Sequence, residues 1–399
     1  MLDTLQAEAA QLGKPHWRPM LRYTAALHAR SLHPPRGPLS RPWEEIGPGY
    51  HLAPAFGHWD IVHQILDSLP AEPDHARDQL LNDLENQQPD GFLPGSIWMR
   101  DKPEWSTVFG HPPVWPVAVQ DYCDLAGTNA LIALAFQPLV KQIAWFEAAR
   151  KAERIGFYYT DILNHKWESG IDEGVRFDQV ATGPFACVDA TAHVYLMCDR
   201  AARWATALGE DPAPFARKAA ALRDFMQHDL FDDETGLFHD VWSVGRPERR
   251  PLAFEGMWPM VVGAASPDQA RRVIDDNLLD PERFFSPHPI ATVALTDPRF
   301  ELRMWRGPTW NSMTYWAARG CLRYGRADAA RLLLAAALDA SAAQFDRTGT
   351  IWEFYHPLGG EPEQLGRKPQ TSQNTPCRDY LGHDPLLAMA RMWHHAQTA

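Results

Sequence analysis

The sequence predicts an all-α fold, a closed ring of six helix pairs with long loops on one face. Helical periodicity dominates the chain, and the helices come in pairs in which a short Gly-containing turn precedes a second helix rich in Ala and Arg. Long segments rich in Pro, Gly, Trp and His separate the pairs. Because no linker-like change in composition divides the chain, we expect residues 1–399 to form one domain.

Several segments have the apolar spacing of amphipathic or buried helices. Some begin at a Pro or just after a Ser, Asp or Asn, which suit the first helical turn. Gly127 and Gly325 are predicted helix stops. The predicted helices are residues 17–31, 73–85, 131–151, 185–208, 212–228, 267–278, 309–324 and 327–345.

The predicted pairs lie near residues 113–151, 184–230, 253–280 and 308–345, and the predicted loops are residues 32–56, 87–116, 152–183, 236–255, 281–308 and 347–379. Short extended pieces are expected at residues 236–242 and 350–355. In such a ring the inner helices are apolar all round and the outer ones amphipathic. A generic α-solenoid or bundle is the alternative, although no fixed-length repeat supports a solenoid.

Composition excludes several classes of protein. A net charge of −12 argues against a nucleic-acid binder or a polybasic membrane anchor, which need a basic surface. The hydrophobic content of 45% excludes disorder, and no apolar run is long enough to span a bilayer. The five scattered cysteines form no C-x-x-C pair, and no secretory signal is evident, so we expect a reduced, cytoplasmic protein.

Tryptophan is in excess, with 16 residues in the chain, and half of them fall in the predicted loops. A buried Trp needs a hydrogen-bond partner for its N–H, so packing of the core alone does not explain this excess. Aromatic faces in an acidic, loop-lined hollow suit a sugar, whose C–H faces stack on rings. The loop tryptophans are Trp43, Trp98, Trp105, Trp115, Trp167, Trp242, Trp305 and Trp352.

The segment from Trp167 to Asp178 is the first candidate for chemistry. Small residues just upstream of Asp172 would let the backbone present this carboxyl into a pocket, where aromatic neighbours would raise its pKa as a general acid requires. Arg176 would then orient a carboxylate or a substrate hydroxyl. The alternative is an acidic loop paired with Arg176.

The second candidate is Glu353, which lies between aromatic residues just after a predicted helix. Such a carboxylate could deprotonate a water, unless only its neighbours face the core. Asp172 and Glu353 together offer the pair of carboxyls that glycoside hydrolysis uses.

Other sites have weaker support. No zinc-ligand spacing, nucleotide-binding glycine motif or G-x-S-x-G is present, so we expect no cofactor and no metal. Calcium could bind the carboxylates of residues 232–234, although a solvated turn at a helix end is the simpler interpretation.

Taken in order, five short motifs make the chain resemble the inverting α-glycosidases with an (α/α)6 barrel, the glycoside hydrolase family 63 group that includes mannosylglycerate and glucosylglycerate hydrolases, and the related trehalases. The motifs are Phe56-Gly57-His58-Trp59-Asp60, Asp90-Gly91-Phe92-Leu93-Pro94 followed by His111-Pro112-Pro113, Glu168-Ser169-Gly170-Ile171-Asp172, Arg306-Gly307-Pro308-Thr309-Trp310-Asn311, and Trp352-Glu353-Phe354-Tyr355.

The resemblance implies an (α/α)6 toroid in which Asp172 protonates the leaving oxygen and Glu353 activates water on the opposite face of the sugar. It also implies that Trp59 and Asp60 hold the non-reducing sugar, with Arg306 on another wall. Together with nearby aromatic and polar residues, the expected substrate-binding set is Trp59, Asp60, His111, Trp115, Trp167, Arg176, Trp305, Arg306, Trp310, Asn311 and Tyr355.

Two departures stand out. His111 replaces the usual Gln, and residues 378–385 lack the usual aromatic-Ser/Gly-Trp motif. We therefore predict an inverting hydrolase of a small α-linked glucoside or mannoside, of the glycosylglycerate or α-disaccharide type, with a small carbohydrate as its partner. Homo-oligomerisation stays open. The rivals are a sugar epimerase or isomerase using a His pair, and a non-catalytic carbohydrate-binding barrel.

Overall fold

The computed structural model describes residues 2–398 except 53, 108, 165–166 and 180–182. These internal exceptions all fall within segments that the sequence predicts as loops. The loop prediction at these positions therefore lies outside the described residues.

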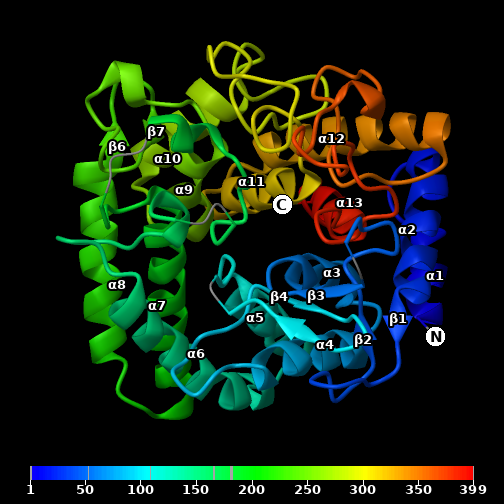
Figure 1. The fold of residues 1–399 in the computed structure, drawn as a ribbon, viewed down its shortest axis with the longest axis horizontal. Helices are drawn as coiled ribbons and strands as arrows, with labels where there is room; N and C mark the ends of the chain where they lie inside the picture. Colours follow the sequence, from blue (N-terminus) through cyan, green and yellow to red (C-terminus); the bar gives the residue numbers. More distant parts are fainter. Residues whose placement is uncertain (1, 53, 108, 165–166, 180–182, 399) are drawn as a thin grey trace.

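Two concentric layers of helices form the (α/α)6 barrel that the sequence predicts, and the chain alternates between the outer and the inner layer (Figure 1). The outer helices are α2 (Arg18–Arg30), α4 (Pro73–Glu85), α6 (Ala130–Ala149), α8 (Ala213–Phe225), α10 (Pro267–Val273) and α12 (Ala327–Thr348). The inner helices are α3 (Asp60–Ser68), α5 (Trp115–Ala126), α7 (Val188–Leu208), α9 (Trp258–Val262), α11 (Asn311–Arg323) and α13 (Leu386–His395). A short helix, α1 (Asp3–Ala9), precedes the ring.

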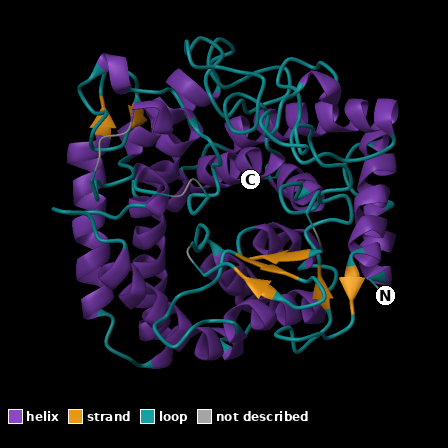
Figure 2. Ribbon diagram, viewed as in Figure 1, coloured by secondary structure: helices purple, strands orange, loops and turns teal. Residues whose placement is uncertain are grey.

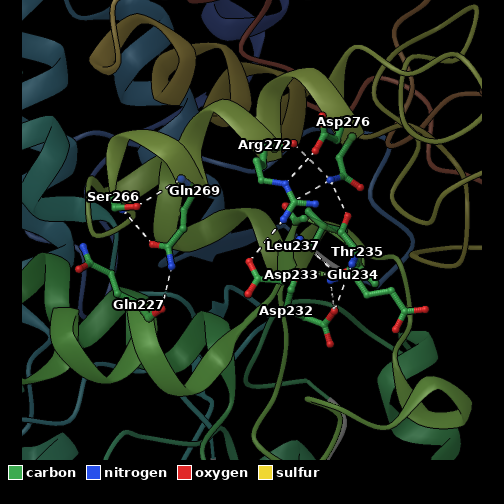
Figure 3. A network of polar contacts seen from close by, with 12 residues as sticks. Gln227, Asp232, Asp233, Glu234, Thr235, Leu237, Ser266, Gln269, Arg272 and Asp276 are labelled. Atoms are coloured by element: carbon green, nitrogen blue, oxygen red, sulfur yellow. Dashed lines mark hydrogen bonds and ion pairs between the residues drawn. The ribbon is translucent and has the colours of Figure 1, made fainter.

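Local sequence signals set many helix boundaries. At the start of α10, the Ser266 side chain accepts from the Gln269 backbone while the Gln269 side chain accepts from the Ser266 backbone, which makes a capping box (Figure 3). The predicted stop Gly127 ends α5 in the left-handed conformation, with φ +64°, and Gly325 follows α11 with φ +72°. Glycine adopts this conformation without a Cβ clash, so these stops are confirmed.

Two predicted helices change from α to π geometry before they end. The segments predicted as single helices at residues 212–228 and 267–278 are α8 and α10, each continued by a π-helical turn, Met226–Leu230 and Ile274–Leu278. Inner helices α5 and α9 fall within the predicted pairs near residues 113–151 and 253–280, whereas α3 and α13 lie in no predicted helix or pair.

Helix α3 is buried along its whole length, although it contains five polar residues. Each polar group that the inner layer buries needs a partner. His63 donates through Nδ1 to the Gly382 carbonyl at 2.7 Å and accepts at Nε2 from the Trp316 indole at 2.9 Å. Asp67 accepts from the Ala388 backbone at 2.6 Å, which ties α3 to the start of α13.

Among the described residues, extended structure is limited to short strands, mostly gathered near α3 and α4 (Figure 2). Within the predicted piece at residues 236–242, β7 forms a hairpin with β6, whereas residues 350–355 contribute isolated bridges, Trp352 to Arg378 and Tyr355 to Thr309. The strands are β1 (Leu32–His33), β2 (Trp43–Glu44), β3 (Ala55–Gly57), β4 (Ser96–Trp98), β5 (Glu104–Trp105), β6 (Phe231–Asp232) and β7 (Leu237–Phe238), paired as β1–β2, β3–β4–β5 and β6–β7.

The acidic turn at residues 232–234 makes contacts with arginines. Asp232 accepts from the backbone of Glu234 and from Arg250, which also pairs with Glu234. Asp233 pairs with Arg272 at 3.5 Å (Figure 3). The turn is therefore cross-linked to neighbouring segments by guanidinium groups.

Across the described part of the chain, none of the helices combines the length and the apolar character that crossing a membrane requires.

Candidate active site

A cavity of about 250 Å³ lies where loops preceding the inner helices converge. Its lining comes from the segments before α3, α5, α7, α11 and α13, so the N-terminal ends of these helices face the same hollow. The lining residues are Ile46, Tyr50, Leu52, Trp59, Asp60, Ser96, Trp98, Phe109, His111, Trp167, Gly170, Asp172, Met304, Trp305, Trp310, Glu353, Arg367, Lys368, Tyr380 and His383.

The structure brings together most of the predicted site residues. Both predicted catalytic carboxyls line this cavity, and so do six of the predicted substrate-binding residues. These are Asp172 and Glu353, with Trp59, Asp60, His111, Trp167, Trp305 and Trp310.

Asp172 lies on the cavity wall with its side chain 18% exposed, and its Oδ2 is 3.2 Å from Lys368 Nζ. Burial raises the pKa of Asp172, and the Glu353 charge raises it further, while Lys368 and Arg367 oppose that rise. Because burial outweighs the cations, the carboxyl is shifted toward the protonated form that a general acid needs.

Glu353 lies in the opposite electrostatic setting. Burial alone would raise its pKa, but Arg367 donates to both carboxylate oxygens, at 2.7 and 2.9 Å, and the Cys377 backbone donates at 3.0 Å. These cationic and hydrogen-bonding partners outweigh burial and lower the pKa of Glu353. The two carboxyls of the cavity are thus shifted in opposite directions, the arrangement that separates an acid from a base.

Asp60, the first residue of α3, is a third buried carboxyl of the cavity. Burial raises its pKa to about 6, although the Tyr380 hydroxyl donates to its Oδ1 at 2.8 Å and opposes that rise. Gly57 and Gly382 leave room for this carboxyl, since a Cβ on either glycine would lie 2.2 or 2.4 Å from its oxygens. Its position is therefore fixed by close backbone contact on two sides.

Three tryptophans form a continuous stack along the cavity. The rings of Trp305 and Trp310 are stacked with centroids 3.7 Å apart, and Trp59 stacks on Trp305 at 5.9 Å. His383 meets all three edge-on, at 4.7 to 5.4 Å. This wall is rigid and apolar, the surface on which a pyranose C–H face packs.

Close packing also fixes the backbone that leads to Asp172. Gly170 has φ +71°, and a Cβ at this position would lie 2.0 Å from Trp59 Cζ3. Only glycine accepts both the backbone conformation and the contact. Gly170 therefore lets the segment that leads to Asp172 lie directly against Trp59.

Two predicted substrate-binding arginines lie outside the cavity lining and hold the Asp172 segment instead. Arg176 is buried and donates to Asp189 and Asp240 at 2.9 Å. Arg306 makes a bidentate pair with Asp178 at 2.9 and 2.5 Å. Burying an arginine requires such charged partners, and here carboxylates neutralise both guanidiniums. The sequence had predicted that both would face the substrate.

Three further predicted residues also lie outside the lining. Trp115 is buried in the core and donates to Gln142 at 2.7 Å. Asn311 donates to Asp384 Oδ1 at 2.7 Å, and the Tyr355 hydroxyl donates to Asp384 Oδ2 at 2.7 Å. Through Asp384, Asn311 and Tyr355 join α11, the Glu353 segment and the start of α13.

Sequence reasoning missed several lining residues, including Tyr50, Arg367, Lys368, Tyr380 and His383. Tyr380 and His383 lie in residues 378–385, which depart from the family motif, and that departure was the available signal. Arg367 and Lys368 lie in a polar loop with no recognisable motif, so nothing in the sequence marked them.

The two histidines of the cavity are both held neutral. Burial lowers the pKa of His111 to about 3 and lowers the pKa of His383 well below its usual value. His383 is also fixed by Ser312, whose hydroxyl lies 2.7 Å from its Nδ1.

A helical ring with paired carboxyls in a tryptophan-walled cavity is the architecture of an (α/α)6 glycosidase. The family model described as the mannosylglycerate hydrolase MGH1-like glycoside hydrolase domain matches residues 53–374, and the chain belongs to this family. It is therefore a glycoside hydrolase by family.

Known relatives agree with this assignment. A mannosylglycerate hydrolase from Rubrobacter radiotolerans is 22% identical, over 79% of this chain and 89% of the relative. The crystal structure of a GH63 mannosylglycerate hydrolase from Thermus thermophilus in complex with glucose matches with a TM-score of 0.72 and 20% identity, over 96% of this chain and 100% of that one. The neutral trehalase from Saccharomyces cerevisiae matches with a TM-score of 0.65 and 16% identity, over 86% of this chain and 72% of that one.

Proposed function

We propose that the protein hydrolyses a small α-linked glucoside or mannoside with inversion, using Asp172 as general acid and Glu353 as general base. The observation that carries this proposal is that both carboxyls line one cavity while their pKa values are shifted in opposite directions. The tryptophan stack and Asp60 supply the apolar face and the hydroxyl acceptor that a sugar needs.

In the proposed reaction Asp172 gives its proton to the glycosidic oxygen as the bond from that oxygen to the anomeric carbon breaks. A water attacks the same carbon from the opposite face and gives its proton to Glu353. The products are the free sugar and the protonated aglycone, and Glu353 then returns its proton through solvent to Asp172.

The substrate class follows from the relatives and from charge. The curated relative and one solved neighbour are mannosylglycerate hydrolases, and another neighbour is a trehalase, so glycosylglycerates and α-disaccharides are the substrate types to examine. Lys368 places a cation beside Asp172, on the cavity wall, where an acidic aglycone would lie.

An isomerase would need histidines with pKa values near neutrality as proton shuttles. His111 and His383 line the cavity, but burial keeps both neutral down to low pH, which argues against that rival. A purely binding protein would need the tryptophans but neither carboxyl.

The test is hydrolysis of a panel of α-glucosides and α-mannosides, followed by proton NMR of the first anomer released. Asp172→Asn and Glu353→Gln should each lower kcat on the order of 10²–10⁴-fold. Retention of configuration, or near-wild-type turnover by either variant, would overturn the mechanism. Binding without turnover by the wild type would instead favour the binding protein.

A further inference from the structure

Arg367 and Lys368 are consecutive residues that place one cation beside each carboxyl of the proposed pair. Arg367 is locked to Glu353 by two hydrogen bonds, and only 4% of its side chain is exposed. The Lys368 ammonium lies 3.2 Å from Asp172 Oδ2, and 24% of the Lys368 side chain is exposed. The two cations therefore differ in how easily they can change partner.

The backbone holds this pair of cations against the cavity. The Gly366 amide donates to the Leu302 carbonyl at 2.9 Å, and the Gly366 carbonyl accepts from the Met304 amide at 3.0 Å. Asn374 accepts from the Arg367 amide at 3.0 Å. Lys368 thus extends from a fixed point, and its flexible side chain is what can move.

Other arginines near the Asp172 segment are already neutralised. Arg150 forms an ion pair with Glu168, Arg176 with Asp189, and Arg306 with Asp178 and Glu301. In a chain with net charge −12, a negatively charged substrate needs a local cation. Lys368 lines the cavity and holds its partner more weakly than Arg367 does.

The contact between Lys368 and Asp172 opposes catalysis in the empty site. An ammonium at 3.2 Å favours the carboxylate, whereas a general acid must hold a proton. Burial and the Glu353 charge favour the protonated form as soon as Lys368 turns away. Four other titratable groups interact electrostatically with Asp172. Arg367 lowers the pKa of Asp172, and the Asp172 charge raises the pKa values of Asp60, Asp161 and Tyr50.

We propose that Lys368 selects substrates whose aglycone carries a carboxylate, because the ammonium exchanges Asp172 for that carboxylate and leaves Asp172 free to take up a proton. The inference rests on the proposed function of Asp172. In the exchange Lys368 stays charged, the aglycone carboxylate replaces the Asp172 carboxylate beside it, and Asp172 takes one proton from solvent. A neutral aglycone leaves the original ion pair intact, so its glycoside is turned over slowly.

The first test compares two glycosides of the same sugar, one with glycerate and one with glycerol as aglycone. The wild type should prefer the glycerate compound in kcat/KM on the order of 10- to 100-fold, the size of one charge-assisted contact. Lys368→Met should bring the ratio close to one, through loss on the glycerate compound and a rise in kcat on the glycerol compound, because the ion pair that holds the Asp172 carboxylate is gone. Lys368→Arg keeps the charge and should keep part of the preference.

Lys151→Met is the matched control, because Lys151 is an exposed lysine at the end of α6 whose ion pair is with Glu147. It should leave the ratio unchanged. If the wild type hydrolyses both compounds and Lys368→Met keeps the wild-type ratio, the role of Lys368 is wrong while the hydrolase stands. If the wild type hydrolyses no glycoside, the proposed function itself fails.

The second test needs no turnover. Titration calorimetry with glycerate in buffers of different ionisation enthalpy measures the protons taken up on binding. The wild type should take up protons when it binds glycerate, and both Lys368→Met and Asp172→Asn should take up almost none. Glycerate binding to the wild type without proton uptake would overturn the exchange.

Discussion

The Arg367 guanidinium donates to both carboxylate oxygens of Glu353, through Nε at 2.7 Å and Nη2 at 2.9 Å. Both side chains are almost fully buried, so the ion pair replaces the water that would otherwise solvate the carboxylate. It also orients the carboxylate, since the guanidinium fork and the carboxylate must be nearly coplanar. The ion pair therefore lowers the pKa of Glu353, although burial in the cavity acts to raise it.

Arg367→Met should move the acidic limb of the kcat/KM profile to higher pH. With Arg367 present the pKa of Glu353 is lowered, so the carboxylate persists below its ordinary range. Without it, burial dominates and the pKa rises, so less base is present at any given pH. A profile measured from pH 4 to 8 checks this, with the fold verified by circular dichroism. An unchanged acidic limb would show that Glu353 is not the group that sets it.

Asp60→Asn should stabilise the protein at neutral pH while it lowers activity. The pKa of Asp60 is raised by burial from about 3.8 to about 6, so the folded state binds the proton more tightly than the unfolded chain. Stability is therefore lost as pH rises from 3.8 through 6, by about 3 kcal/mol in total. Asn removes the ionisation and can still accept from Tyr380.

Urea unfolding at two pH values tests the Asp60 prediction. The variant should be more stable than the wild type at pH 7, and the difference should vanish below the ordinary pKa of an aspartate. A variant that is less stable than the wild type at pH 7 would show that the ionised Asp60 carboxyl does not destabilise the folded state.

Arg176→Met should act through stability and leave KM unchanged. Arg176 is surrounded by Asp189, Asp240 and Glu255, and burial raises the pKa of Asp240 to about 6 and that of Glu255 to about 7 despite the guanidinium. Removing the arginine leaves buried carboxyls without a counter-charge, a loss of about 3–5 kcal/mol in the free energy of unfolding. Adding Asp189→Asn should recover part of that loss. A large rise in KM with unchanged stability would restore the substrate-binding role that the sequence predicts.

His28 should make stability fall at alkaline pH. Burial opposes its charged form, but Glu44 at 2.6 Å and Asp67 at 3.1 Å outweigh burial and raise the pKa to about 10. Between the ordinary value of 6.5 and about 10, the folded state keeps a proton that the unfolded chain has lost. The stabilisation is complete below 6.5 and disappears as pH rises toward 10, by up to about 1.4 kcal/mol per pH unit.

The measurement is the free energy of unfolding at several pH values from 6.5 to 10, for the wild type and His28→Gln. The variant should begin less stable and lose less stability over this range. Equal slopes for the two proteins would assign the alkaline loss to other groups.

The sequence predicted the outer helices better than the inner ones. Helix α4 begins and ends at the predicted residues 73 and 85, because its Pro start and amphipathic pattern are local signals. Helix α3 was missed because it is short and because its buried polar residues, such as His63 and Asp67, interrupt any apolar periodicity. His63 donates to Gly382 and Asp67 accepts from Ala388, partners more than 300 positions away that no local pattern records.

Within the candidate site, several motif residues named from the sequence line the cavity, whereas the residues that contact them were not anticipated. Asp172, Glu353, Trp59 and Asp60 lie in short recognisable motifs, and all four line the cavity. Arg306 also lies in a motif, yet its guanidinium faces Asp178 and Glu301. A motif indicates that a residue matters near the site, but the direction of its side chain depends on which acids the fold brings beside it.

By itself the sequence determined the helical ring and the two carboxyls, because helix periodicity, turn glycines and short motifs are all encoded within a few residues. Tertiary structure alone decided which cations meet those carboxyls. Arg367 and Lys368 come from a loop with no motif, and they reach Glu353 and Asp172 only when the segments before α7 and α13 converge. Burial and charge contacts across that convergence set the proton affinities, and both depend on three-dimensional distance, which sequence order does not contain.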